Sequence, residues 1–111
     1  MKKDYYYIVI LKDGKSYGVE LIRGYIDEYG LYGYRYVKKP KKSRWECIDL
    51  KSGLLVIAKK TIDECVKFVI ENENNLNKIR ETSAYKHNVA LFNRTVKAQQ
   101  MKDDAEFNAG W

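Results

Sequence analysis

Few side chains in this chain have the types and spacing that catalysis requires. Asp49-Leu50-Lys51 has the acid, any residue, lysine form of many metal-dependent nucleases, and Asp27 or Glu46 could supply a further magnesium ligand. The alternative is an ordinary strand end that leads into a Lys-Ser-Gly turn. The single histidine, His87, has no serine or cysteine placed by the sequence to act with it as a nucleophile. We therefore predict a protein that is not an enzyme, with no catalytic residue, metal site or cofactor.

Cys47 and Cys65 are the only cysteines, and no second pair gives them metal-ligand spacing. Free cysteine packs like a small hydrophobic residue, so we predict two reduced, buried thiols. The longest apolar runs, 5–11 and 54–58, are much shorter than the roughly 20 residues that span a bilayer. We expect a soluble, cytoplasmic protein without a signal peptide or membrane contact.

Positive charge is concentrated in the first part of the chain. Residues 1–60 carry 14 Lys and Arg against 7 Asp and Glu, whereas residues 61–111 carry 7 against 8. Six basic residues with no acidic residue among them form what we call the basic cluster: Arg35, Lys38, Lys39, Lys41, Lys42 and Arg44. Such a cluster fits phosphate contacts, which dominate affinity for nucleic acids. The alternative is a lysine-rich loop that only increases solubility.

Tyrosine follows the same distribution, with nine of the ten before residue 37. Tyr32, Tyr34 and Tyr36 alternate along one strand face that leads into the basic cluster, and rings on such a face stack against unpaired bases. The alternative is that a helix covers them as part of the core. Four more residues could extend the surface if their side chains share this face: Arg23, Tyr25, Tyr29 and Trp45.

Five strands are predicted to position these residues. Alternating, β-branched and aromatic segments predict strands at 5–11, 16–26, 31–37, 44–50 and 54–58. Asp13-Gly14 is a typical tight hairpin turn, and glycine also ends the turns at 27–30 and 51–53. Residues 38–43 form an exposed loop, because Pro40 donates no ladder hydrogen bond and four lysines repel one another.

The hydrophobic period changes to that of a helix after Lys60. Thr61-Ile62-Asp63-Glu64 is a capping box that starts a helix. A second helical stripe consists of Tyr85, Val89, Phe92 and Val96, and it either packs in the core or forms a homodimer surface. We predict two helices, or one long helix with a kink between Asn72 and Ser83.

The predicted fold class is therefore α+β: an antiparallel meander of about five strands followed by two C-terminal helices. We assign 1–102 to a single domain and 103–111 to a flexible C-terminal tail, because the tail has no periodicity.

The stretch from Arg44 to Glu64 combines a strand, a Lys-Ser-Gly turn, a strand and a capped helix. This pattern resembles the small arm-type DNA-binding domains of phage integrases. The resemblance implies a sheet that contacts DNA, with a helix packed behind it. This chain departs from the pattern by having two more strands and a second helix.

The sequence thus predicts a small, basic, non-enzymatic binding protein that engages nucleic acid or a nucleoprotein complex through its tyrosine-rich sheet and loop. The alternative is a phage or mobile-element accessory protein that inhibits a host defence nuclease complex by protein–protein contact, in the manner of an anti-CRISPR protein. Tyrosine and arginine are frequent at the energetic centres of protein interfaces, so the same surface fits both functions.

Overall fold

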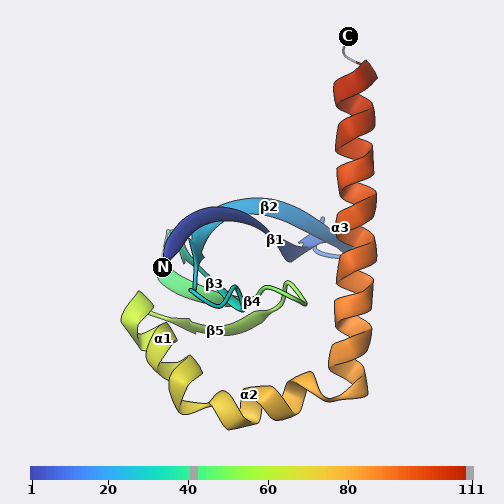
Figure 1. Ribbon diagram of the computed structural model, residues 1–111. Helices are drawn as coiled ribbons and strands as arrows, with labels where there is room; N and C mark the ends of the chain where they lie inside the picture. The colour runs from blue at the N-terminus through green and yellow to red at the C-terminus, as the bar shows by residue number, and fades with distance from the viewer. Residues whose placement is uncertain (41–42, 110–111) are drawn as a thin grey trace.

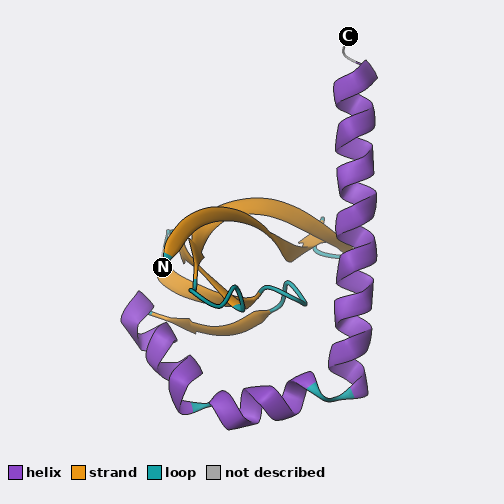
Figure 2. Ribbon diagram, viewed as in Figure 1, coloured by secondary structure: helices purple, strands orange, loops and turns teal. Residues whose placement is uncertain are grey.

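The computed structural model describes residues 1–40 and 43–109, which form an α+β fold (Figures 1 and 2). One antiparallel sheet contains five strands in chain order: β1 (Lys2–Lys12), β2 (Ser16–Ile26), β3 (Tyr32–Val37), β4 (Arg44–Asp49) and β5 (Leu55–Lys59). Three helices follow: α1 (Ile62–Glu71), α2 (Glu73–Arg80) and α3 (Ser83–Ala109). The predicted fold class is confirmed, but the helical part has three helices where two were expected.

The sheet is strongly curved, because β1 and β2 form a long ribbon that arches over β3 and β4 (Figure 1). These two strands pair along their whole length, whereas β2 pairs with β3 only at Tyr25 and Ile26. The N–H of Val9 donates to the carbonyl of Gly53 at 2.9 Å and so joins the ribbon to the β4–β5 turn. Gly24 allows β2 to approach β3 closely, since a Cβ at this position would lie 2.6 Å from the carbonyl oxygen of Tyr34.

The curvature produces a core on each side of β3 and β4. On the outer side, Tyr32, Tyr34 and Cys47 pack against Cys65 of α1. On the inner side, Tyr6 and Ile8 of β1 pack against Ile48 of β4, together with other aliphatic residues of the ribbon. Both cysteines are free and fully buried, as predicted.

Two local hydrogen-bond arrangements divide the helical region. Thr61 caps the start of helix α1: its hydroxyl accepts from the N–H of Glu64 at 3.2 Å, as the capping motif predicts. Asn72 caps the end of α1, and its side-chain amide donates to the carbonyl of Phe68 at 2.9 Å. Thr82 separates α2 from α3: its hydroxyl donates to the carbonyl of Ile79 and accepts from the N–H of Tyr85. Side chains that compete with helical hydrogen bonds therefore give two interruptions, not one.

Helix α3 extends well beyond the sheet, and its C-terminal part has no element beside it in Figure 1. It continues to Ala109, so residues 103–109 are helical, and the predicted boundary at residue 102 does not coincide with a helix end. Gly110 and Trp111 lie outside the described residues. None of the helices in the described ranges combines the length and the hydropathy that crossing a membrane requires.

Candidate functional site

The two arginines of the basic cluster are engaged within the protein. Arg35 and Arg44 lie on neighbouring strands and both bind the carboxylate of Glu46, at 2.9 and 2.6 Å. Glu46 is only 6% exposed. Burial favours the neutral form of Glu46, but the hydrogen bonds from Arg44 and Arg35 outweigh it and lower the pKa of the carboxyl. Two of the six residues of the basic cluster therefore pair with a buried charge of the protein itself.

The lysines of the cluster have a different environment. Lys38 and Lys39 directly follow β3, and both are exposed. Lys41 and Lys42 fall outside the described residues. Of the cluster, Lys38 and Lys39 thus offer exposed positive charge at the end of the sheet.

The three predicted stacking tyrosines have different exposure. Tyr32 and Tyr34 are 7% and 2% exposed in the core beneath the helices, so the stacking prediction is wrong for them and the core alternative is correct. The physical reason is that apolar side chains of α1 and α2, including Val66 and Leu76, pack against the core cluster that contains both tyrosines. Tyr36 is 53% exposed, so its ring remains available to a ligand.

Tyr36 belongs to a row of aromatic rings on the outer face of the sheet. It is the cross-strand partner of Trp45, and the two ring centroids are 5.7 Å apart. The Trp45 ring lies 6.2 Å from that of Tyr25, and the Nζ of Lys3 lies 5.8 Å from the Tyr25 centroid. On the other side of Trp45, its partner on β5 is Lys59.

These residues form what we call the basic–aromatic end: Lys3, Tyr25, Tyr36, Lys38, Lys39, Trp45 and Lys59. Tyr25 and Trp45 were considered in the sequence as extensions of the tyrosine face, whereas Lys3 and Lys59 were missed. Only the strand register could have indicated these two lysines, because it pairs Lys3 with Tyr25 and Lys59 with Trp45. Tyr29 does not belong to this surface, because it lies in the turn at the opposite end of β3. Arg23 lies instead over the ring of Tyr5, at 5.6 Å.

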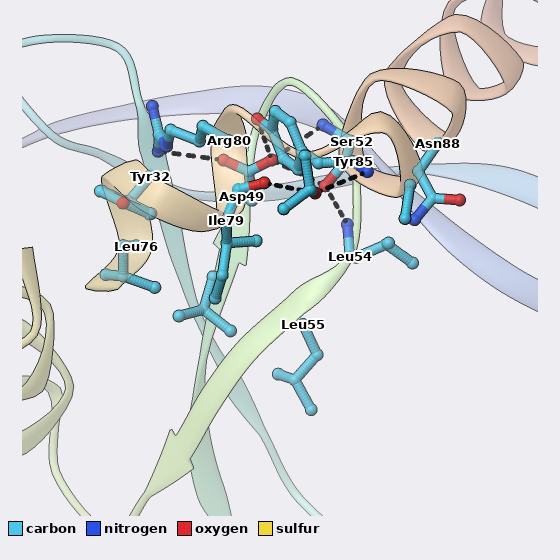
Figure 3. A pocket seen from close by; sticks show the side chains of 13 residues that line it. Tyr32, Asp49, Ser52, Leu54, Leu55, Leu76, Ile79, Arg80, Tyr85 and Asn88 are labelled. Carbon is cyan, nitrogen blue, oxygen red and sulfur yellow. Dashed lines mark hydrogen bonds and ion pairs between the residues drawn. The ribbon is translucent and has the colours of Figure 1, made fainter. Parts of the chain in front are cut away.

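Asp49, the residue that suggested a nuclease, accepts hydrogen bonds from Ser52, Arg80 and Tyr85 (Figure 3). One carboxylate oxygen accepts from Arg80 at 3.1 Å. The other accepts from the hydroxyl of Tyr85 at 2.8 Å and from the hydroxyl and N–H of Ser52 at 2.7 and 3.1 Å. The two helical partners could not be predicted from the sequence, because they are 31 and 36 residues away.

The other two acids of the nuclease hypothesis lie apart from this cluster. Asp27 accepts from the N–H of Leu31 at 2.9 Å and so closes the β2–β3 turn, and Glu46 is bound by its two arginines. Within residues 1–40 and 43–109, no group of three or more acidic, histidine or cysteine side chains is arranged to hold a metal ion. The carboxylates therefore have structural partners of their own, and Asp49 links β4 to α2 and α3.

The Asp49 cluster forms one wall of a cavity of about 300 Å³ between the β4–β5 turn and the start of α3 (Figure 3). Leu55, Leu76 and Ile79 supply much of its apolar lining. The side chains of Asp49, Ser52, Arg80 and Tyr85 already bind one another at this cavity, so they have little hydrogen-bonding capacity left for a ligand.

The stripe on α3 packs mainly against its own chain. Phe92 is 5% exposed and lies against Gly53, and Tyr85 binds Asp49. Val89 and Val96 are half-buried. Tyr85 and Phe92 therefore fit the core alternative, and a homodimer surface through this stripe remains the other alternative.

Comparison of this chain with protein-family models, curated proteins and solved structures found no match.

Proposed function

We propose that this protein binds single-stranded nucleic acid at its basic–aromatic end and has no catalytic activity of its own. The observation that carries the proposal is the exposed ring of Tyr36, which packs against Trp45 beside two exposed lysines. An exposed ring next to free positive charge is the combination that single strands require, since bases stack on the ring and phosphates pair with the lysines.

The aromatic row favours an unpaired strand over a duplex. In a duplex the flat faces of the bases are already stacked on one another, so a tyrosine on a sheet cannot reach them without unstacking. Tyr36 and Trp45 are held in place by their neighbouring strands, so little side-chain entropy is lost when a base stacks on them. Each such stack contributes about 1 to 3 kcal/mol.

The lysines would supply the salt-dependent part of the affinity. Lys38 and Lys39 have no ion-pair partner among the described residues, whereas the Nζ of Lys59 lies 5.9 Å from the centroid of the Phe68 ring of α1. Binding of phosphates by such lysines releases counterions, so affinity should fall linearly with salt on a logarithmic scale.

Fluorescence anisotropy with labelled single- and double-stranded DNA and RNA, over a range of salt up to physiological, tests this function. We expect single strands to bind more tightly and Tyr36→Ala to weaken binding about tenfold or more. The double variant Lys38→Ala/Lys39→Ala should reduce the salt slope by about 1.4, at about 0.7 for each phosphate contact.

Two matched controls lie on other parts of the surface. Tyr29→Ala removes a tyrosine that is 77% exposed, and Lys12→Ala/Lys15→Ala removes two exposed lysines near the β1–β2 turn. Both controls should bind like the parent protein. If the control variants lose as much affinity as the test variants, the binding is non-specific attraction to a basic protein. The surface would then fit the protein–protein alternative better.

A further inference from the structure

A second surface lies at the opposite end of β3 from the basic–aromatic end. The β2–β3 turn and helices α1 and α2 enclose an apolar cleft of about 540 Å³. This volume lies within the range of about 300 to 1,000 Å³ that is usual for ligand sites. Its apolar lining includes Tyr29 and Leu31 from the turn and Val66, Val69 and Ile70 from α1.

Two large hydrophobic side chains that line this cleft are mostly exposed to solvent. Tyr29 is 77% exposed and Ile70 is 68% exposed, and they are on the two elements that border the cleft. Val66 and Val69 on the same helix are half-buried against the outer core. The apolar face of α1 therefore extends from the buried core to Ile70, which no element of the described chain covers.

The charged side chains that line this cleft are all acidic, and the one positive group at its lining is the N-terminal ammonium of Met1. Asp27, Glu28 and Glu73 line it, and no lysine or arginine occurs among its lining residues, all of which are described. Neither glutamate forms an ion pair with another described residue. Their carboxylates are therefore free to pair with an incoming positive charge, even though the whole chain has a net charge of +6. At physiological salt, charges more than about 8 Å away are largely screened, so the nearby acids dominate.

We infer that this cleft binds a short basic peptide segment of a partner protein, with one or two large apolar side chains inserted between Tyr29 and Ile70. The apolar lining would bury those side chains, and Glu28 and Glu73 would pair with flanking lysines or arginines. Charge complementarity selects this occupant, because a nucleic acid would bring phosphates against carboxylates. The inference is independent of the proposed function at the other end of the sheet.

Segments of the chain itself fit the cleft less well. The C-terminal part of α3 is acidic, with Asp103, Asp104 and Glu106, so it would be repelled by the acids of the cleft. The loop 38–42 of a second copy is basic but contains only lysine and proline, so it has no large apolar side chain to insert. A partner segment must combine both properties, as the interface centres of proteins commonly do.

Selection from a displayed library of random dodecapeptides at physiological salt tests the inference. The variant Glu28→Lys/Glu73→Lys serves to remove peptides that bind elsewhere on the protein. We expect the remaining sequences to combine lysine or arginine with tryptophan, phenylalanine or leucine. A labelled peptide of this kind should bind the parent protein and lose about tenfold or more in affinity on Ile70→Ser.

Matched controls distinguish the cleft from general effects. Ile79→Ser removes an isoleucine that is 52% exposed on α2 and lines the other cavity, and Glu20→Lys/Glu81→Lys changes two exposed acids outside the cleft. Both control variants should bind the peptide like the parent. The inference is wrong if acidic or uncharged peptides are selected, if no peptide depends on the cleft, or if Ile79→Ser weakens binding as much as Ile70→Ser.

Discussion

The hydroxyl of Tyr85 donates a hydrogen bond of 2.8 Å to Oδ2 of Asp49, and so joins the start of α3 to the end of β4. The same carboxylate accepts from Arg80 at the end of α2 and from Ser52 in the turn. Burial and the neighbouring Asp49 carboxylate raise the pKa of Tyr85, so its hydroxyl keeps its proton and remains a donor. One carboxylate therefore fixes two helices and a turn relative to the sheet.

Removing the Tyr85 hydroxyl should destabilise the protein without creating a cavity in the core. In Tyr85→Phe the ring remains, but the buried carboxylate loses one of its donors, and we expect a loss of about 1.5 to 3 kcal/mol in the free energy of unfolding. Urea unfolding, followed by circular dichroism, measures the loss. Tyr5→Phe is the matched control, because Tyr5 is 58% exposed and should lose almost nothing. Equal stability of the two variants would mean that the Asp49 cluster does not hold α3.

Gly53 is required both for its backbone conformation and for the space beside it. Its φ is +71°, and a Cβ there would overlap the ring of Phe92 on α3. Gly53→Ala should therefore cost about 1 to 2 kcal/mol for the left-handed backbone and about 1 to 3 kcal/mol more for the overlap. Gly30→Ala separates the two effects, since Gly30 has a φ of +68° but nothing within 4 Å of a Cβ. Thermal unfolding of both variants checks the difference, and an equal loss would show that Phe92 adapts freely.

The strands could be predicted from the sequence because strand and turn patterns depend on residues that are close in the chain. Period-two alternation and turn glycines located all five strands to within a few residues, and the antiparallel meander followed from the short connections. The arch of the β1–β2 ribbon could not be predicted, because it depends on Gly24 and Gly33 approaching Tyr6, contacts that are distant in the sequence. The second helix break was missed because Asn72 and Thr82 bound a single predicted kink region, and only their side-chain hydrogen bonds show that each one interrupts the helix separately.

The candidate site was harder to predict, because exposure changes within one strand. Tyr34 and Tyr36 share a face of β3, yet they are 2% and 53% exposed, since alternation does not reveal how far α1 covers that face. Arg44 and Glu46 are two residues apart on one strand, which could have indicated their pairing. The contribution of Arg35 required the register between β3 and β4, which the length of the intervening loop does not fix.

Glu46 should make the stability of the protein depend on pH in the acidic range. Its hydrogen bonds with Arg44 and Arg35 lower its pKa below the ordinary value of 4.5 despite its burial, so the folded state binds this proton less readily than the unfolded state does. The resulting stabilisation is fully present above pH 4.5 and is lost as the pH falls through the lower pKa of the folded state. Glu46→Gln removes this contribution, so the difference in unfolding free energy between parent and variant should shrink as urea titrations are repeated at decreasing pH.

Glu20→Gln is the matched control. Glu20 is exposed and forms no ion pair among the described residues, so its substitution should leave the pH profile of stability unchanged. A parent-to-variant difference for Glu46→Gln that stays constant with pH would show that the two arginines do not stabilise the charged form of Glu46.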